Sequence, residues 1–383
     1  MNKIALNFSR IFVGVLFIFS GLIKANDTLG FGYKLEEYFD VFHISFFSPY
    51  ATGIAMILCV LEIVLGALLL FGFWNRKVAT GLLGIIIFFT FLTFVSAAFK
   101  VVTSCGCFGD AIPLTPWQSF SKDLVLLLLI VYLFIHRNSI LPVTQNAGVQ
   151  KIALIAVVAL SFIFTIYTYS YLPVIDFLPY KVGASLPDAM KIPEGAEPDQ
   201  YLIMYKLKNK ATAETKEMSD KDYLKTEIWK DSNWQIVGNP VQKLIKKGYE
   251  PKIKDLIISD AAGTNYTKEL LENPYYNLII VAYNLNNTNT EAIGKLNALT
   301  MDATEQFNIR TVLLTSNSAQ DAEAFSKRSK LLSEIFYADA VPLKSMVRAN
   351  PGVLLLKNGV VINKWSYQSV PSFEKLKTAY FDK

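Results

Sequence analysis

Two closely spaced cysteines are the residues of this sequence best suited to chemistry. Cys105 and Cys107 lie within residues 104–110, which read SCGCFGD. A disulfide between them would close a very small, strained ring that is easily reduced, and Gly106 and Gly109 supply the backbone freedom such a turn needs. Three interpretations stay open: a redox pair, a structural clamp or two packed thiols, and metal ligands. The last would need ligands from elsewhere, because two thiolates are too few for a closed zinc site.

Glu62 is the second candidate, because it lies inside an apolar run. A carboxyl in the middle of a membrane span is costly and is usually functional or paired inside the helix bundle. Its functional interpretation is a proton relay or a polar anchor for a quinone-like ligand. Its structural interpretation is a hydrogen bond to Ser20, Thr90 or Thr93. Cys59 shares a helix face with Glu62, but a cysteine at such a position is usually a small packing residue.

The remaining polar candidates are few. Arg10 and Lys24 lie near the two ends of the first apolar run, where long cationic side chains usually reach toward lipid headgroups; a catalytic role is the alternative. His43 and His136 are the only histidines, and the topology below places them on opposite sides of the membrane. We therefore predict no histidine-based catalytic pair and no histidine-based metal cluster within one chain. No phosphate-binding loop or nucleophile elbow appears either.

The composition is that of two unlike halves. Of 383 residues, 52% are hydrophobic and 18% are charged, which excludes a disordered or acidic solvating protein. Residues 1–171 contain 17 Lys, Arg, Asp or Glu residues, whereas residues 172–383 contain 52. The net charge of +5 is not clustered along the chain, so nucleic acid is not an expected partner.

Five apolar runs are long enough to cross a bilayer, which takes about 20 residues. They are residues 8–23, 51–74, 78–102, 117–135 and 152–171. The first lacks a cleavage site, so we interpret it as a retained helix. Lys and Arg at the N-terminus, at residues 76–77 and at residues 137–151 predict that these segments are cytoplasmic. In the inner (cytoplasmic) membrane of a bacterium, the cysteine loop and everything after residue 171 would then face the periplasm, where disulfides persist.

The same chemistry-bearing residues resemble a known family. Those that resemble the DoxX family are Arg10, residues 17–22 (FIFSGL), Lys24 and Glu62. Those similar to the MauE branch of that superfamily are residues 105–109 (CGCFG), Pro113, Trp117, Lys122 and Asp123. The resemblance covers residues 1–137. It implies a four-helix membrane bundle linked to disulfide formation in a periplasmic partner enzyme.

The soluble half begins with a proline-rich linker and a small β element. Strands are predicted at residues 201–207, 215–218 and 234–237. From residue 248 the pattern is α/β, with strands at 254–259, 277–283 and 311–315, helices at 291–307 and 321–332, a hairpin of 353–357 and 360–365, and a closing helix at 372–380. The order β-β-α-β-α-β-β-α over residues 248–383 resembles a thioredoxin-like domain, with Pro351 in the place of that family's cis-proline.

The thioredoxin-like resemblance has one chemical exception. The family's Cys-x-x-Cys motif would follow the strand at 277–283, but residues 284–288 read NLNNT. This domain is therefore expected to bind or dock a partner rather than to exchange thiols itself. Its peptide-facing groove would lie near Pro351, flanked by Met346 and Arg348.

The expected fold class is a membrane α-helical protein with a soluble α/β domain. It comprises a four-helix DoxX-like bundle (1–137), a linker and fifth transmembrane helix (138–171), a linker and small β element (172–247) and a thioredoxin-like domain (248–383). Residues 30–47, between the first two spans, suit a helix at the membrane interface. This helix would either pack on the bundle or contact a ligand.

The leading functional interpretation is an inner-membrane thiol–disulfide protein. Cys105 and Cys107 would exchange disulfides with a periplasmic or envelope protein that the thioredoxin-like domain recruits. Electrons would need an acceptor such as a quinone, with Glu62 as a candidate proton group. The alternative is a non-enzymatic anchor or scaffold subunit of a cell-envelope complex, in contact with membrane lipid, whose cysteines only tie a loop. A small-molecule or lipid transporter would rest on Glu62 alone.

Overall fold

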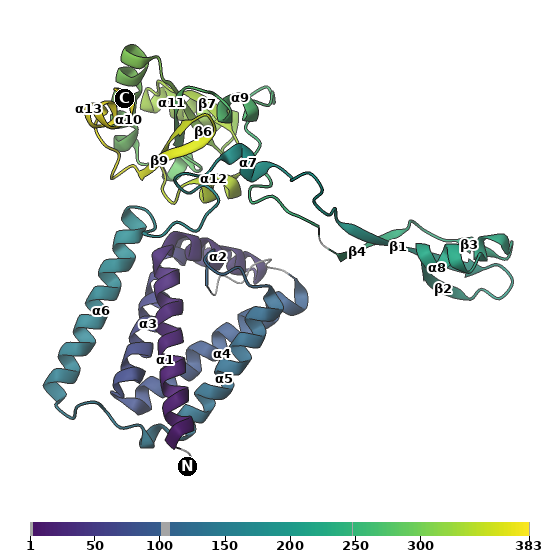
Figure 1. Ribbon diagram of the computed structural model, residues 1–383, viewed down its shortest axis with the longest axis horizontal. Coiled ribbons are helices and arrows are strands. Elements are labelled where there is room, and N and C mark those ends of the chain that lie inside the picture. Colours follow the sequence, from purple (N-terminus) through teal and green to yellow (C-terminus); the bar gives the residue numbers. More distant parts are fainter. Residues whose placement is uncertain (1–2, 101–107, 247, 383) are drawn as a thin grey trace. The chain divides into compact units, whose positions relative to one another are not determined.

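The computed structural model describes residues 3–100, 108–246 and 248–382 (Figure 1). Cys105 and Cys107 lie outside the described residues. The chain divides into two compact units, one made of Met1–Leu186 with Asp255–Lys383 and the other of Pro187–Lys254. Among the described residues, the first unit holds the long helices and a five-stranded sheet, and the second holds a four-stranded sheet.

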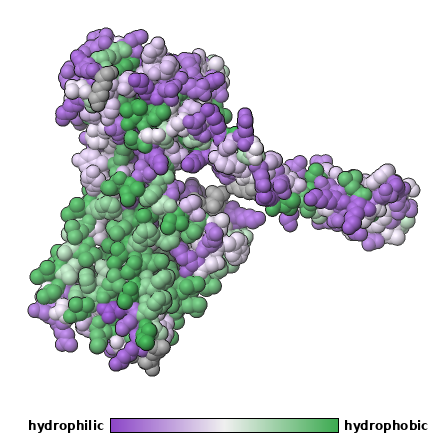
Figure 2. Space-filling view, in the orientation of Figure 1, coloured by the Kyte–Doolittle hydropathy of each residue, from purple (hydrophilic) through white to green (hydrophobic). Residues whose placement is uncertain are grey.

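Five helices of the described residues are long and apolar enough to span a membrane. They are α1 (Lys3–Asn26), α3 (Ala51–Phe71), α4 (Asn75–Phe99), α5 (Pro116–Ile135) and α6 (Ala147–Ser170), and a 3-10 turn, η1 (Ser45–Tyr50), precedes α3. They coincide with the five predicted spans, which confirms that prediction. Figure 2 shows hydrophobic residues gathered over the surface of these helices, while the part with the C-terminal sheet is mostly hydrophilic.

Close packing of α1 on α3 depends on glycines. A Cβ added to Gly14 would lie 2.6 Å from the side chain of Leu70, and one added to Gly66 would lie 2.7 Å from the Gly14 carbonyl oxygen. Small residues of this kind let membrane helices approach closely. The apolar core that these helices form with α4 and α5 includes the fully buried Val13, Leu69, Leu82, Ile130 and Leu133.

Local sequence signals set the start of α5. The Thr115 side chain accepts a hydrogen bond from the Gln118 backbone N–H, and the Gln118 side chain accepts one from the Thr115 backbone N–H. Pro116 occupies the first helical position, where its missing N–H costs nothing. This capping box starts the helix shortly after the cysteine segment, as the sequence predicts.

Helix α2 (Thr28–Val41) packs on the bundle between α1 and α3 along the chain. The Asp27 side chain accepts a hydrogen bond from the Gly30 backbone N–H and caps the helix. Phe31 and Leu35 are buried in a core shared with Ala55 of α3. The helix expected within residues 30–47 is therefore a packed helix, one of the alternatives that the sequence left open.

The fifth membrane helix, α6, contacts the bundle through apolar residues that pack on its core and through one hydroxyl group. Ser161, Thr165 and Thr168 are its buried residues. The Thr168 hydroxyl donates to the Ala25 carbonyl oxygen at 2.6 Å and lies 3.2 Å from the Thr28 hydroxyl. These two contacts hold the C-terminal end of α6 against the end of α1 and the start of α2.

The unit Pro187–Lys254 is built around the long strand β1 (Gln200–Asn209). β2 (Thr215–Ser219), β3 (Trp234–Ile236) and β4 (Val241–Lys246) all pair with it in antiparallel fashion. The first three strands agree with the predicted positions, whereas β4 was not predicted. Short helical segments complete the region: α7 (Leu186–Met190), α8 (Asp220–Lys225) and η3 (Ile228–Lys230).

The C-terminal sheet has the strand order β7-β6-β5-β8-β9. β5 (Tyr276–Val281), β6 (Arg310–Thr315) and β7 (Glu334–Tyr337) are parallel, and β8 (Gly352–Lys357) and β9 (Val360–Ser366) add antiparallel strands beside β5. Helices α10 (Thr290–Phe307), α11 (Ala319–Ser329) and α13 (Phe373–Leu376) share one core with the sheet. Consecutive residues of β5 and β6 are buried, as expected for a sheet covered on both faces.

The predicted α/β elements are largely confirmed, with two corrections. Residues 254–259 form no strand, only isolated bridges at Ser259. Strand β7 and the following helix α12 (Ala340–Met346) were not predicted, although β7 pairs with β6 at the sheet edge. The remaining short segments are η2 (Arg137–Ser139), α9 (Thr267–Leu271), η4 (Leu285–Asn287) and η5 (Lys377–Phe381).

Two features lie at the ends of the β8–β9 hairpin. The Asn350–Pro351 peptide bond before β8 is cis. The turn between the strands uses Asn358 and Gly359 with φ of 49° and 75°, as the Asn-Gly pair predicts. The linker after α6 joins this hairpin, because the Gly183 N–H donates to the Val361 carbonyl oxygen and the Leu186 N–H to the Gly359 carbonyl oxygen, both at 2.8 Å.

Candidate functional site

The predicted redox pair, Cys105 and Cys107, lies outside the described residues, so the structure describes only its flanks. Phe108 follows Cys107 in the sequence and is buried. Its ring centroid lies 5.8 Å from that of Phe19 and 5.0 Å from Nζ of Lys122. Phe108, the residue directly after Cys107, therefore packs against Phe19 of α1 and Lys122 of α5.

Glu62 forms an ion pair with Lys24 inside the bundle. Lys24 Nζ lies 2.5 Å from Glu62 Oε1, and the two residues are only 3% and 2% exposed. The ammonium also lies 4.2 Å from the ring centroid of Phe89 and 5.3 Å from that of Phe31, contacts that favour a cation. The expectation that Lys24 reaches toward lipid headgroups is therefore wrong, and the sequence missed Lys24 as the partner of Glu62.

A second ion pair, between a half-buried cation and a buried carboxylate, lies on α5. Lys122 Nζ is 2.6 Å from Asp123 Oδ1, and Asp123 is buried. The Thr93 hydroxyl of α4 donates to Asp123 Oδ2 at 3.1 Å, so the polar partner expected for Glu62 binds a different carboxylate. The sequence noted Lys122 and Asp123 only as family residues. Their spacing gave no sign that they belong to the same site as Glu62.

The two ion pairs line one small cavity. Its wall includes Ser20, Lys24, Glu62, Lys122 and Asp123, and its volume is about 20 Å³. A polar cavity of this size has room for about one water molecule with several hydrogen-bond partners. Carboxylates and ammonium groups joined through one water can pass protons, but no organic ring fits there.

Two other residues singled out from the sequence, Cys59 and Arg10, make contacts that stabilise the helical bundle. Cys59 is fully buried in the core with Ala55 and Ile63, which agrees with its packing interpretation. Arg10 reaches the end of α3, where its guanidinium donates to the carbonyl oxygens of Leu69 and Leu70 at 3.0 and 2.5 Å. Arg10 thus adds hydrogen bonds to carbonyl oxygens in the last turn of α3.

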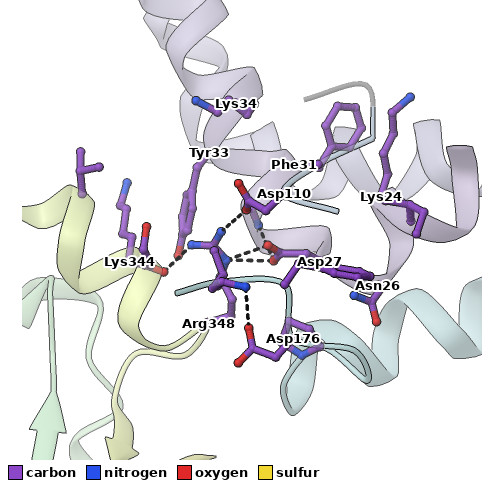
Figure 3. A pocket seen from close by; sticks show the side chains of 18 of the residues that line it. Lys24, Asn26, Asp27, Phe31, Tyr33, Lys34, Asp110, Asp176, Lys344 and Arg348 are labelled. Atoms are coloured by element: carbon purple, nitrogen blue, oxygen red, sulfur yellow. Dashed lines mark hydrogen bonds and ion pairs between the residues drawn. The ribbon is translucent and has the colours of Figure 1, made fainter. Parts of the chain in front are cut away.

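A larger cavity of about 310 Å³, the mouth cavity, lies at the end of α1 (Figure 3). Its wall includes Asp27, Tyr33, Asp110 and Arg348. Lys24 lines both the mouth cavity and the small cavity. Lys24, which pairs with Glu62, is therefore a residue that the two cavities share.

Arg348 joins three segments at the mouth cavity. Its Nε lies 2.9 Å from Asp27 Oδ2, its Nη2 lies 3.4 Å from Asp110 Oδ2, and its Nη1 donates to the Lys344 carbonyl oxygen. Figure 3 shows the guanidinium between the two carboxylates. Arg348 is only 6% exposed. Sequence reasoning placed it beside a peptide groove and did not foresee that its partners come from the helical region.

Two buried cations of the C-terminal part, Arg348 and Lys364, differ in how firmly they hold their protons. Burial alone would lower the pKa of Arg348, but the carboxylates of Asp27 and Asp110 outweigh it and raise that pKa above its ordinary value. Burial lowers the pKa of Lys364, although its ion pair with Asp176 opposes the change. Arg348 is therefore a permanent cation at neutral pH, and Lys364 is the more easily deprotonated of the two.

Aromatic residues extend the contact beside Arg348. The hydroxyls of Tyr33 on α2 and Tyr283 after β5 lie 2.7 Å apart. Lys344 Nζ lies 3.3 Å from Glu36 Oε2 and 4.2 Å from the Tyr33 ring centroid. Burial is the main cause that raises the pKa of both tyrosines. Both hydroxyls consequently stay protonated at pH values where a free tyrosine begins to ionise.

The helical part of the chain that carries the two ion pairs matches a known protein family. The family is described as methylamine utilisation protein MauE, and the match covers residues 2–136. These residues are a MauE family domain. Protein TlpB of Flavobacterium psychrophilum is 32% identical over 128 residues, which are 33% of this chain and 35% of that protein. The chain thus spans about a third of the length of this curated relative. No solved structure matches the chain.

The MauE domain contains every polar group of the two-ion-pair site. Its four charged residues come from three helices: Lys24, Glu62, Lys122 and Asp123. Asp110, which lies shortly after the cysteine segment, lines the mouth cavity. Arg348, by contrast, belongs to the C-terminal domain. The site therefore combines a cluster of charged residues inside the helical bundle with a charged mouth cavity, whose wall includes residues from both parts of the chain.

Proposed function

We propose that this protein exchanges disulfides with a partner protein at a membrane, with Cys105 and Cys107 as its redox pair. The observation that carries the proposal is that two ion pairs of the bundle share one cavity, and that one of them contacts the residue directly after Cys107. Lys122 contacts Phe108, which directly follows Cys107, and its pair shares a cavity with Lys24 and Glu62. Thiol chemistry with a membrane acceptor needs proton-transferring groups at such a position.

The chemistry balances as two coupled exchanges. Two thiols of the partner reduce the Cys105–Cys107 disulfide, so that the partner gains a disulfide and the pair gains two thiols. The pair is reoxidised when two electrons and two protons pass to an acceptor of the quinone class, which becomes a quinol. Glu62 would carry protons on this route. The small cavity has room for about one water, so a quinone ring would bind outside it.

We also propose an orientation for the membrane helices. The cationic segments near residues 3–10, 76–77 and 137–151 would be cytoplasmic in the inner membrane of a bacterium. The cysteine loop and the C-terminal domain would then be periplasmic. A reporter fused after Lys383 tests this, because activity only in the cytoplasm would contradict the orientation.

The C-terminal domain supports a recruiting role in the proposal. The strand order β6-β5-β8-β9, with helices after β5 and β6, is the arrangement we associate with thioredoxin-like domains. Residues 284–288 offer no cysteine after β5, so the domain would bind a partner rather than oxidise it.

A second candidate function is a non-enzymatic anchor of an envelope complex. The specific observation in its favour is the same absence of cysteine after β5. One experiment separates the two functions. In a strain lacking the protein, Cys105→Ser/Cys107→Ser should fail to complement, whereas the matched Cys59→Ala variant should complement. Each single Cys→Ser variant should trap a mixed disulfide with the partner. Full complementation by the double variant would rule out the redox function.

A further inference from the structure

The C-terminal domain has a surface that fits the chain's own membrane region. We propose that the face formed by Tyr283, Lys344 and Arg348, here called the α12 face, binds helix α2 and the segment at Asp110. External proteins therefore bind this domain on another surface. The proposal requires no redox chemistry and stands whether or not the cysteines are a redox pair.

The geometry of Arg348 is the first argument. Its guanidinium binds carboxylates from two separate segments, Asp27 and Asp110, and also the Lys344 carbonyl oxygen. A planar fork of donors is satisfied in this way only when the opposing surface presents acceptors at matching positions. Arg348 is 6% exposed, so its guanidinium is largely shielded from solvent, unlike the cation of an exposed surface ion pair.

Charge complementarity is the second argument. The helical region contributes the carboxylates of Asp27, Glu36 and Asp110, and the α12 face contributes the cations of Lys344 and Arg348. Opposite signs on the two sides fix the register of a contact and disfavour other partners. Asp176, in the linker after α6, adds a carboxylate that binds Lys364 of β9.

An aromatic contact at the same place is the third argument. The Tyr33 and Tyr283 hydroxyls bond at 2.7 Å, with their rings nearly perpendicular. Tyr33 also offers its ring to Lys344 at 4.2 Å and to Arg348 at 5.6 Å. Aromatic and arginine residues at the centre of a dry contact usually carry most of its binding energy. The α12 face has this composition.

The α12 face lies where a thioredoxin-like domain would carry its dithiol and bind its substrate. Tyr283 follows β5, where a thioredoxin-like dithiol would be found, and Arg348 precedes the Asn350–Pro351 bond. The surface that such domains would use for a substrate is thus committed to α2. Through Asp110 it also holds the segment two residues after Phe108. Arg348 acts as a positioning residue for that segment.

The test measures distances in the full-length protein in lipid nanodiscs. The three native cysteines are replaced by Cys59→Ala, Cys105→Ser and Cys107→Ser, and spin labels are attached at Glu37→Cys and Val341→Cys, which line the mouth cavity from opposite sides of the contact. We expect one narrow, short distance distribution. Arg348→Glu should shift the docking equilibrium at least about 30-fold toward separated domains, the lower end for losing a buried charged partner.

Control variants keep the test specific. Arg310→Glu breaks exposed ion pairs with Glu269 and Glu334 on the same domain, and it should leave the distribution unchanged. Adding Asp27→Arg to Arg348→Glu should restore the short distance, which a misfolded domain could not do. The proposal is overturned if Arg348→Glu keeps the parent distribution, or if Arg310→Glu broadens it equally.

Discussion

The buried pair of Lys24 and Glu62 permits a sharp prediction about stability. Lys24→Met leaves a carboxylate 2% exposed without its cation, and Glu62→Met leaves an ammonium 3% exposed without its anion. Breaking one partner of a buried pair costs about 3–5 kcal/mol, whereas replacing both partners by apolar residues of similar volume is often neutral. We therefore expect each single variant to lose about 3–5 kcal/mol of unfolding free energy and the double variant to lose less than either.

Reversible unfolding in mixed detergent micelles, followed by circular dichroism, measures these free energies. The apolar walls of the small cavity, with Phe17, Ile86 and Leu126, can accept two methionines. The reasoning is refuted if the double variant loses the sum of the two single losses. An assay of disulfide exchange tests a separate point. A stable double variant that no longer supports exchange would assign a proton-transfer role to the pair of Lys24 and Glu62. If exchange persists in it, the proton role fails while the stability argument holds.

Three further predictions concern other contacts. Arg10→Lys keeps the charge but loses the fork that binds two carbonyl oxygens of α3, so it should lower the unfolding free energy by about 1–2 kcal/mol in the same titration. Thr168→Val removes the hydroxyl that donates to α1 and should cost about 1 kcal/mol. Burial raises the pKa of Tyr33 and Tyr283, so their stabilisation of the docked state is complete below the ordinary tyrosine pKa of about 10 and declines as the pH rises above it. The docked fraction of the spin-labelled protein against pH measures this, and Tyr33→Phe/Tyr283→Phe should remove the dependence.

For each of these three predictions, one experimental result would contradict the reasoning. Equal stability of the Arg10→Lys and native proteins would mean that charge, and not the fork, matters at the end of α3. An unaffected Thr168→Val variant would mean that α6 is held by its apolar contacts alone. A docked fraction that declines identically with and without the two tyrosine hydroxyls would assign the alkaline change to other groups.

Regular elements were predictable where a single periodic signal dominates. The five spans follow from apolar length, and α5 begins where Thr115 and Pro116 indicate. The hairpin turn at Asn358-Gly359 follows from residues that tolerate positive φ. Strand β7 was missed because its four residues carry too little pattern, and its order depends on pairing with β6.

The candidate site was predictable only one residue at a time. Glu62 is conspicuous in an apolar run, but its partner lies 38 positions away on another helix. Lys24 looked like a helix-end cation because sequence places it near the end of a span, whereas helix packing encloses it with Phe89 and Phe31. Asp123 was noted only for its family resemblance, because its hydrogen bond with Thr93 depends on how α4 packs against α5.

The sequence by itself determined that this chain has five apolar spans, a soluble half and one closely spaced pair of cysteines, because these follow from local composition and spacing. The tertiary structure alone decided which charges meet. Ion pairs between Lys24 and Glu62, and between Arg348 and Asp27, join residues 38 and 321 positions apart. Such pairs depend on how helices and sheets pack in three dimensions, which no local pattern encodes.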